Sequence, residues 1–204
     1  MNFIATLIAL SVFVLCFPLY HLIYLHFSSN FSSKTKKGRI NRCARSWLIA
    51  TLEEKDYLLT THQIRNMIMG ITFLASTVVI LIGLLVKLEE LSLNYPLPQD
   101  RVSYASWLIL ITLGYSFVNL LLALRHLTNL TTLIRSDPEE LRQIEGKEPA
   151  EYLTKLFVTG SQSYMMGRRG FLYGIVVLGW YFDVWVFVGL TLLLTVSLAY
   201  KHDF

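Results

Sequence analysis

Charged side chains are scarce in this chain of 204 residues, because Asp, Glu, Lys and Arg together make up only 16% of it. Soluble domains average about 25%. Here 54% of the residues are apolar, and the mean hydropathy is +0.50. A chain of this composition lacks the polar surface that a water-soluble globule needs, which argues against a soluble enzyme. The high apolar and aromatic content also excludes intrinsic disorder.

Cysteines and catalytic patterns are equally sparse. The two cysteines, Cys16 in an apolar run and Cys43 in a basic stretch, do not indicate a disulfide framework. The histidines lack the i, i+4 spacing of a zinc-binding helix, and no strand-turn-helix pattern frames a nucleophile. We therefore expect no catalytic residue, no metal site, no cofactor and no nucleic-acid partner.

Long apolar runs are plentiful. A membrane-spanning helix needs about 20 mostly apolar residues, and four stretches are long enough. The sequence therefore predicts an all-α membrane protein, a bundle of four transmembrane helices that forms one domain over residues 1–204. The expected spans are residues 3–25, 67–86, 105–124 and 171–199.

Basic residues are distributed unevenly between the connecting segments. Residues 28–65 carry eight Lys and Arg and residues 128–169 carry six, against two in residues 87–104 and one in the carboxyl-terminal tail. The positive-inside rule then places both long segments in the cytoplasm. This predicts a multi-pass protein of the cell membrane with both termini outside the cytoplasm.

Both cytoplasmic segments are expected to contain amphipathic helices. Apolar residues recur at helical spacing over residues 40–51, and the basic flank Lys34–Arg45 would meet anionic lipid headgroups. Asp137 followed by a proline is typical of a helix start. After a break near Gly146, a second helix starts at Pro149 and can run on into the fourth span.

Several polar and basic residues are predicted to lie at one depth, near the inner ends of the spans. One hypothesis is that they converge on a pocket for an anionic lipid headgroup or another anionic ligand, since arginine binds phosphate through two parallel hydrogen bonds. The alternative is that they are independent anchors at the membrane surface. The candidate binding residues are Gln63, Arg65, Asn66, Asn119, Arg125, His126, Arg168 and Arg169.

Three residues at the start of the expected fourth span or within it have more than one interpretation. Asp183 is a candidate for an ion path, but it can also pair with a neighbour or end a helical section. Gly170 and Gly174 form a small-xxx-small pair, which serves equally for contact with a second subunit or for packing inside the bundle.

Seven short stretches carry a resemblance to a known family: Arg45–Trp47, His62–Met69, Phe73–Thr77, Phe117–Asn119, Ala123–His126, Gly167–Gly170 and Gly179–Trp180. In these stretches the chain resembles the domain-of-unknown-function family 599, whose members are small integral membrane proteins. The resemblance implies a four-helix membrane protein and no established reaction. The chain departs from the family at Asp183-Val184, where similar proteins tend to have Gly-Pro.

Taken together, these patterns predict a non-catalytic integral membrane protein. It would act as a structural or accessory subunit, as a homo-oligomer or with other membrane subunits, with anionic lipid bound at its cytoplasmic side. The alternative is an oligomeric small channel or transporter lined by Asn119 and Asp183. A membrane enzyme acting on lipid is a third hypothesis.

Overall fold

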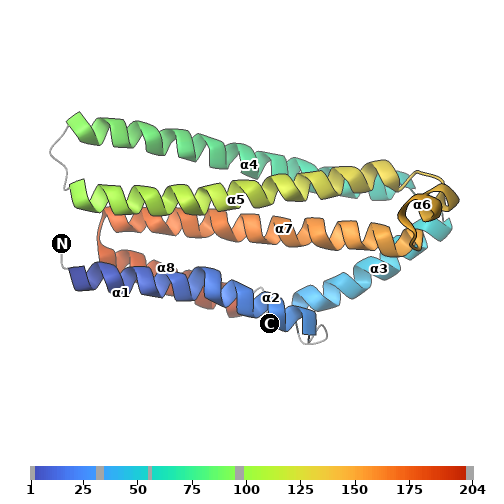
Figure 1. Ribbon diagram of the computed structural model, residues 1–204, viewed down its shortest axis with the longest axis horizontal. Coiled ribbons are helices and arrows are strands. Elements are labelled where there is room, and N and C mark those ends of the chain that lie inside the picture. Colours follow the sequence, from blue (N-terminus) through green and yellow to red (C-terminus); the bar gives the residue numbers. More distant parts are fainter. Residues whose placement is uncertain (1–2, 31–34, 55–56, 95–98, 201–204) are drawn as a thin grey trace.

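The computed structural model describes residues 3–30, 35–54, 57–94 and 99–200, and within these ranges the chain is helical almost throughout, with no strand (Figure 1). Three stretches in these ranges are long and apolar enough to cross a membrane: Phe3–His26, Tyr57–Lys87 and Tyr104–Leu133. The predictions of an all-α fold and of membrane helices at the first three positions are confirmed.

The first rod consists of α1 (Phe3–Val14), a π-helical turn η1 (Leu15–Leu19) and α2 (Tyr20–Asn30). Pro18 lies inside η1. Proline has no N–H to donate and its ring crowds the preceding turn, and a wider π turn is one way in which a helix accommodates this. The amino-terminal part of the rod packs against α8 at the far end of the sequence.

Two long helices, α4 (Tyr57–Asn94) and α5 (Gln99–Leu133), pack side by side (Figure 1). At about 1.5 Å per residue they are about 57 and 52 Å long. Both therefore exceed the hydrocarbon core, about 30 Å thick, and continue past the spans predicted at 67–86 and 105–124. Before them, α3 (Lys36–Glu54) crosses the bundle obliquely, so the predicted connecting segment 28–65 is largely helical.

The second connecting segment, residues 128–169, has the helix start and the break that the sequence predicts. The carboxylate of Asp137 accepts a hydrogen bond from the backbone N–H of Glu139 at 3.1 Å, which caps α6 (Pro138–Glu145). Gly146 ends α6 with φ of +65°, a conformation that suits glycine. The next helix, α7 (Pro149–Val177), runs without a break into the apolar region, as predicted.

The prediction of one helix over residues 171–199 is wrong. The chain leaves α7 at Val177, turns through the 3₁₀ segment η2 (Leu178–Tyr181) and returns as α8 (Val184–Leu198) along the rest of the bundle (Figure 1). Asp183 caps α8 by accepting a hydrogen bond from the N–H of Trp185 at 2.7 Å. Apolar residues continue through the turn, so hydropathy alone does not reveal the reversal. Helix α8 consequently runs away from the end where the amino terminus lies.

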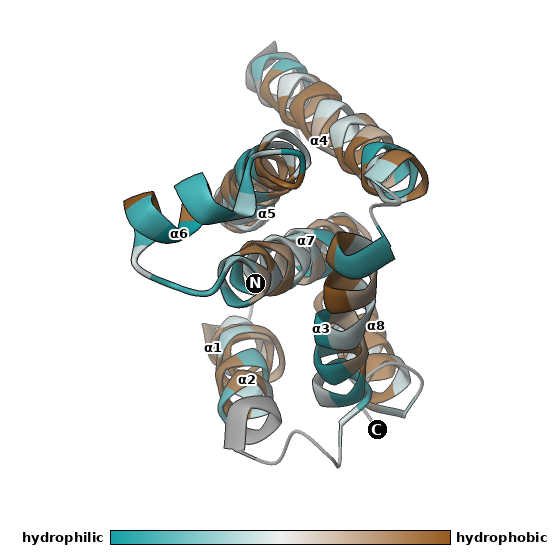
Figure 2. Cartoon of the chain, turned by 90° about the vertical axis from the view of Figure 1, so that its right-hand side faces the viewer, coloured by the Kyte–Doolittle hydropathy of each residue, from teal (hydrophilic) through white to brown (hydrophobic). Residues whose placement is uncertain are grey.

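Helix α7 lies at the centre, with α5, α1–α2, α3 and α8 around it (Figure 2). Its glycines lie against α5. A Cβ on Gly167 would lie 2.7 Å from Cγ of Leu120, and one on Gly174 would lie 2.6 Å from Cδ2 of Leu113. Gly170 is almost as close to Ser116. The alternatives left open for Gly170 and Gly174 are thus resolved, since both pack inside the bundle.

Candidate functional site

A cavity of about 260 Å³ opens between α2, α3 and α7, and cations dominate its polar lining. Its lining consists of Tyr24, Lys36, Lys37, Ile40, Asn41, Ser161, Tyr164, Met165, Arg168 and Arg169. We call it the basic cavity. Two lysines and two arginines surround it, and the described residues that line it include no aspartate or glutamate. The arrangement is suited to an anion.

The lysines of the basic cavity come from the first turn of α3. Oγ1 of Thr35 accepts a hydrogen bond from the N–H of Gly38 at 3.1 Å, which caps the helix and fixes the place of Lys36 and Lys37. The amino end of a helix carries a partial positive charge, so cations there are unfavourable and acidic residues are preferred. The first turn of α3 has no acidic residue. Both the helix end and its lysines therefore contribute positive potential to the cavity.

The arginines come from the middle of α7, and its contacts with α5 show their depth. Oγ of Ser116 donates a hydrogen bond to the carbonyl of Gly167 at 2.7 Å. Ser116 lies well inside the apolar stretch Tyr104–Leu133 of α5. Arg168 and Arg169 follow Gly167 directly, so they lie within the apolar length of the bundle. They lie inside α7 (Pro149–Val177) and not ahead of a helix, and Arg169 also meets Tyr24, close to the end of the apolar stretch Phe3–His26. Their position at the inner boundary of the membrane stays a prediction.

The two arginines differ in their surroundings. Arg169 is only 1% exposed, and its guanidinium lies 4.8 Å from the centroid of the Tyr24 ring, a cation–π contact between α7 and α2. Arg168 is half-buried, and its Nε atom is buried without a hydrogen-bond partner. Arg169 thus lies against an aromatic face, whereas Arg168 lines the cavity and keeps part of its surface exposed.

The aromatic groups beside the basic cavity fix α2 and α8 against α7. The hydroxyl of Tyr173 donates to the carbonyl of Cys16 at 3.1 Å and lies 2.7 Å from Oγ1 of Thr195. The buried ring of His21 packs edge-on against Tyr173, and its Nδ1 bonds to the carbonyl of Phe17. Because residues four apart share a helix face, Tyr173 lies on the same face of α7 as Arg169.

The eight predicted binding residues do not come together. Arg168 and Arg169 line the basic cavity, whereas Gln63 lies in a different pocket. The other five are spread over the α4 and α5 surfaces or bonded to their own helix. Arg65, Asn66 and Arg125 are exposed, the Asn119 amide donates to the Tyr115 carbonyl at 2.9 Å, and Nδ1 of His126 bonds to the Leu122 carbonyl at 2.7 Å.

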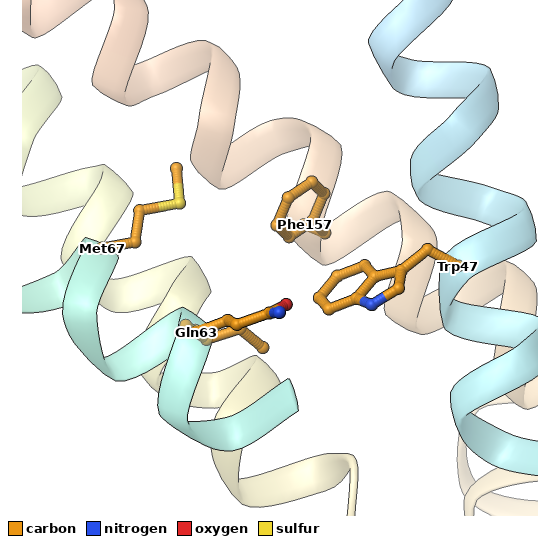
Figure 3. A pocket seen from close by; sticks show the side chains of 5 residues that line it. Trp47, Gln63, Met67 and Phe157 are labelled. Atoms are coloured by element: carbon orange, nitrogen blue, oxygen red, sulfur yellow. The ribbon is translucent and has the colours of Figure 1, made fainter. Parts of the chain in front are cut away.

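Gln63 belongs to a pocket of about 400 Å³ between α3, α4 and α7, lined also by Trp47, Ile64, Met67 and Phe157. In Figure 3 the Gln63 amide points from α4 across this space toward Trp47. The rings of Trp47 and Phe157 meet edge-on with centroids 5.5 Å apart. The described lining is mainly aromatic and apolar and includes no cation, so it does not share the chemistry of the basic cavity.

Sequence reasoning missed three contributors to the basic cavity, which are Lys36, Lys37 and Tyr24. The lysines were assigned to a general basic flank facing lipid headgroups. A sharper signal was present, because Thr35 begins a helix whose first turn is basic instead of acidic. Tyr24 had no comparable signal, since only the packing of α2 on α7 brings it to Arg169.

Asp183, the predicted ion-path residue, lies in the turn between η2 and α8 and not deep within a span. Its carboxylate is used as the α8 cap. Of the alternatives left open for Asp183, the structure shows the one in which it ends a helical section. In the described ranges no group of three His, Cys, Asp or Glu residues is placed to hold a metal ion.

A protein family described as "protein of unknown function, DUF599" matches residues 8–204. The match covers nearly the whole chain, so the chain belongs to this family. No curated protein and no solved structure matches it significantly.

Proposed function

We propose that this is a non-catalytic integral membrane protein that binds an anionic lipid headgroup in the basic cavity and serves as a structural or accessory subunit. The observation that carries the proposal is the gathering of Lys36, Lys37, Arg168 and Arg169 around one space. Ionisable residues inside a membrane bundle are costly and generally serve a function or find a partner. The lining offers cations, hydroxyls and an amide, which is a set of groups that binds an anion.

The proposed orientation follows from the charges and from the path of the chain. With the amino terminus outside, α1–α2 and α5 run inward, α4 and α7 run outward, and α8 returns inward. The lysine-rich start of α3 then faces the cytoplasm. This gives five intramembrane segments instead of four, with the end of α8 inside.

Thiol labelling tests this orientation with a cysteine that is already present. Cys43 is exposed on α3, and Tyr200→Cys adds a second thiol at a residue that is 85% exposed. A membrane-impermeant maleimide added to intact cells is expected to label neither site and to label both after permeabilisation. Labelling of Tyr200→Cys in intact cells would contradict the inward return of α8.

Self-association is the second element of the proposal. On α4, a Cβ added to Gly70 or Gly83 would meet nothing within 4 Å, in contrast to the glycines of α7. Both residues are exposed, so a second membrane helix can approach the α4 backbone closely there. The channel alternative loses its expected lining, because Asn119 and Asp183 are both engaged in hydrogen bonds with nearby backbone.

Native mass spectrometry of the protein in a gentle detergent tests the binding function. We expect anionic lipid to copurify with the wild-type protein and to be lost from the Lys36→Gln/Lys37→Gln variant. Arg39→Gln/Arg42→Gln is the matched control, because it removes the same charge from exposed positions of α3 that do not line the cavity. Equal lipid retention by both variants would overturn the proposal. A purely monomeric spectrum would overturn self-association alone.

A further inference from the structure

The pocket between α3, α4 and α7 has binding groups of its own (Figure 3). We call it the aromatic pocket, and its described lining consists of Trp47, Gln63, Ile64, Met67 and Phe157. Its volume of about 400 Å³ lies within the usual range of small-molecule sites, about 300–1,000 Å³. Such sites are mainly apolar and aromatic, with a few polar groups that fix the orientation of the ligand. The aromatic pocket has both kinds of lining.

Hydrogen bonds next to the aromatic pocket hold α3 and α4 together. Oγ1 of Thr51 donates to the carbonyl of Trp47 at 2.9 Å and lies 3.1 Å from Oγ1 of Thr60. Both threonines are buried. Thr51 lies one turn after Trp47 on α3. Thr60 lies one turn before Gln63 and Ile64 on α4. The contact between the two threonines therefore fixes how far Trp47 lies from Gln63.

The polar group of the aromatic pocket is the carboxamide of Gln63. This side chain is exposed, and it points from α4 across the open space toward Trp47 (Figure 3). A carboxamide offers an acceptor oxygen and a donor NH₂ group side by side in one plane. It therefore pairs with a ligand edge that carries a donor next to an acceptor, as glutamine does when it binds adenine through N6 and N7. Neither an acyl chain nor a simple ion presents such an edge.

The walls of the aromatic pocket favour a planar ring. The rings of Trp47 and Phe157 have centroids 5.5 Å apart and an interplanar angle of 62°. A planar ligand that stacks on one of these rings meets the other at an angle, and aromatic groups pack favourably in both arrangements. Met67 adds a polarizable thioether, which also packs well against rings.

We propose that the aromatic pocket binds a planar heterocycle with a hydrogen-bond donor beside an acceptor, such as the base of a nucleoside. The carboxamide of Gln63 pairs with the edge of the base, and its ring packs against Trp47 and Phe157. Gln63 lies in the second turn of α4, close to the start of the apolar stretch Tyr57–Lys87, so a water-soluble ligand can reach it. The described linings of the aromatic pocket and the basic cavity share no residue, so this site goes beyond the proposed function.

Equilibrium dialysis of the full-length protein in detergent micelles tests the proposal with two nucleosides. Adenosine carries an amino group beside a ring nitrogen, whereas purine riboside keeps the ring and lacks the amino group. We expect adenosine to bind about tenfold more tightly, because purine riboside forms one hydrogen bond fewer and leaves the Gln63 oxygen without a donor.

A cycle of protein and ligand changes assigns this difference to Gln63. Gln63→Leu should abolish the difference between the two nucleosides. Trp47→Leu should weaken the binding of both by about tenfold, because stacking does not depend on the amino group. The matched controls are Gln143→Leu and Trp107→Leu, which remove the same groups from exposed positions outside the aromatic pocket and should change neither affinity.

The contrary outcomes are equally specific. No binding of adenosine, equal affinity for the two nucleosides, or a difference that survives in Gln63→Leu would overturn the proposal. Tighter binding of tetramethylammonium than of adenosine, lost in Trp47→Leu but not in Gln63→Leu, would overturn it in favour of a quaternary ammonium ligand. Lys36→Gln/Lys37→Gln should leave adenosine binding unchanged, and Gln63→Leu should leave the copurified lipid unchanged. Failure at one site is therefore distinguishable from failure at the other.

Discussion

The two sides of α7 are built from different residues and make different kinds of contact. Toward α5 it presents Gly160, Gly167, Gly170 and Gly174, and the leucines of α5 fill the space that their missing side chains leave. Toward α2 and α3 it presents Arg169 with an aromatic partner, and beside it a cavity remains open. One side is closed by close approach of the backbones, while the other is kept apart by large polar side chains.

This contrast indicates where the bundle derives stability and where it carries function. Helices in lipid gain little from burying apolar surface against one another, so close packing and hydrogen bonds hold them together. The α5 side supplies both, through the glycines and through the bond from Ser116 to Gly167. On the side that faces α2 and α3, a space lined by cations remains open. Such a space is a feature of a binding site.

The largest expected effect on stability comes from adding a side chain on the side of α7 that packs closely against α5. Gly167→Ala places a methyl group against both the side chain and the backbone nitrogen of Leu120, and a backbone atom cannot move aside easily. We expect a loss of about 1–3 kcal/mol in the free energy of unfolding, measured by denaturation in detergent. Gly114→Ala is the control, since its Cβ meets nothing within 4 Å and alanine favours the helix. Equal effects of the two substitutions would contradict the contrast.

The next effect tests the hydrogen bonds on the opposite side. Tyr173→Phe removes the hydroxyl that links α7 to the Cys16 carbonyl and to Thr195, at a buried position. The expected cost is about 1 kcal/mol, seen as a lower midpoint of thermal unfolding. Tyr200→Phe serves as the control because Tyr200 is 85% exposed. No change in Tyr173→Phe would mean that this side contributes little to stability.

A smaller effect concerns the turn that separates α7 from α8. Asp183→Ala removes the α8 cap and should cost somewhat less than about 1 kcal/mol at this half-exposed turn. Asp183→Asn keeps an oxygen acceptor and should behave like the wild type in the same unfolding assay. If Asp183→Asn lowers the stability as much as Asp183→Ala does, the negative charge itself contributes, and helix capping alone does not explain the role of Asp183.

The smallest effect lies outside both sides of α7. Arg142 bridges Glu139 and Glu148 at 3.3 and 2.9 Å across the α6–α7 turn, with all three side chains exposed. The hydrogen bond that Arg142 donates to the Glu148 carboxylate raises the pKa of Arg142 above its ordinary range. A raised pKa of a base contributes stability below its unfolded value, so titration of Arg142 adds no pH dependence near neutrality. We expect Arg142→Gln to leave the thermal midpoint unchanged between pH 6 and 8, and a clear shift would show that the bridge holds the turn.

The sequence predicted the helices better than their arrangement. The start of α6 at Asp137 and its end at Gly146 depend on local capping chemistry, and both were found where the pattern places them. The reversal after Val177 was missed, because a turn buried in an apolar environment leaves no gap in hydropathy. Only Asp183 interrupts the run, and one carboxylate is compatible with several roles.

The candidate site was predicted only in part, for a similar reason. Arg168 and Arg169 are predicted because they directly precede the expected fourth span, at the depth of the other polar and basic residues, and both line the basic cavity. Gln63, Arg65 and Arg125 were grouped with them by depth alone, and depth says nothing about the direction in which a side chain leaves its helix. The structure places these three on other surfaces and brings the lysines of α3 instead.

Composition and local pattern by themselves determined that this chain is helical and apolar, where α6 begins and ends, where α7 begins, and which segments carry positive charge. Those properties depend on neighbours a few residues apart. The tertiary structure alone decided that the glycines of α7 meet α5, that the chain turns back into α8, and that four cations from α3 and α7 share one cavity. Such outcomes depend on the rotation and tilt of whole helices, which are set by contacts between residues far apart in the sequence, 51 positions for Ser116 and Gly167 and 157 for Cys16 and Tyr173.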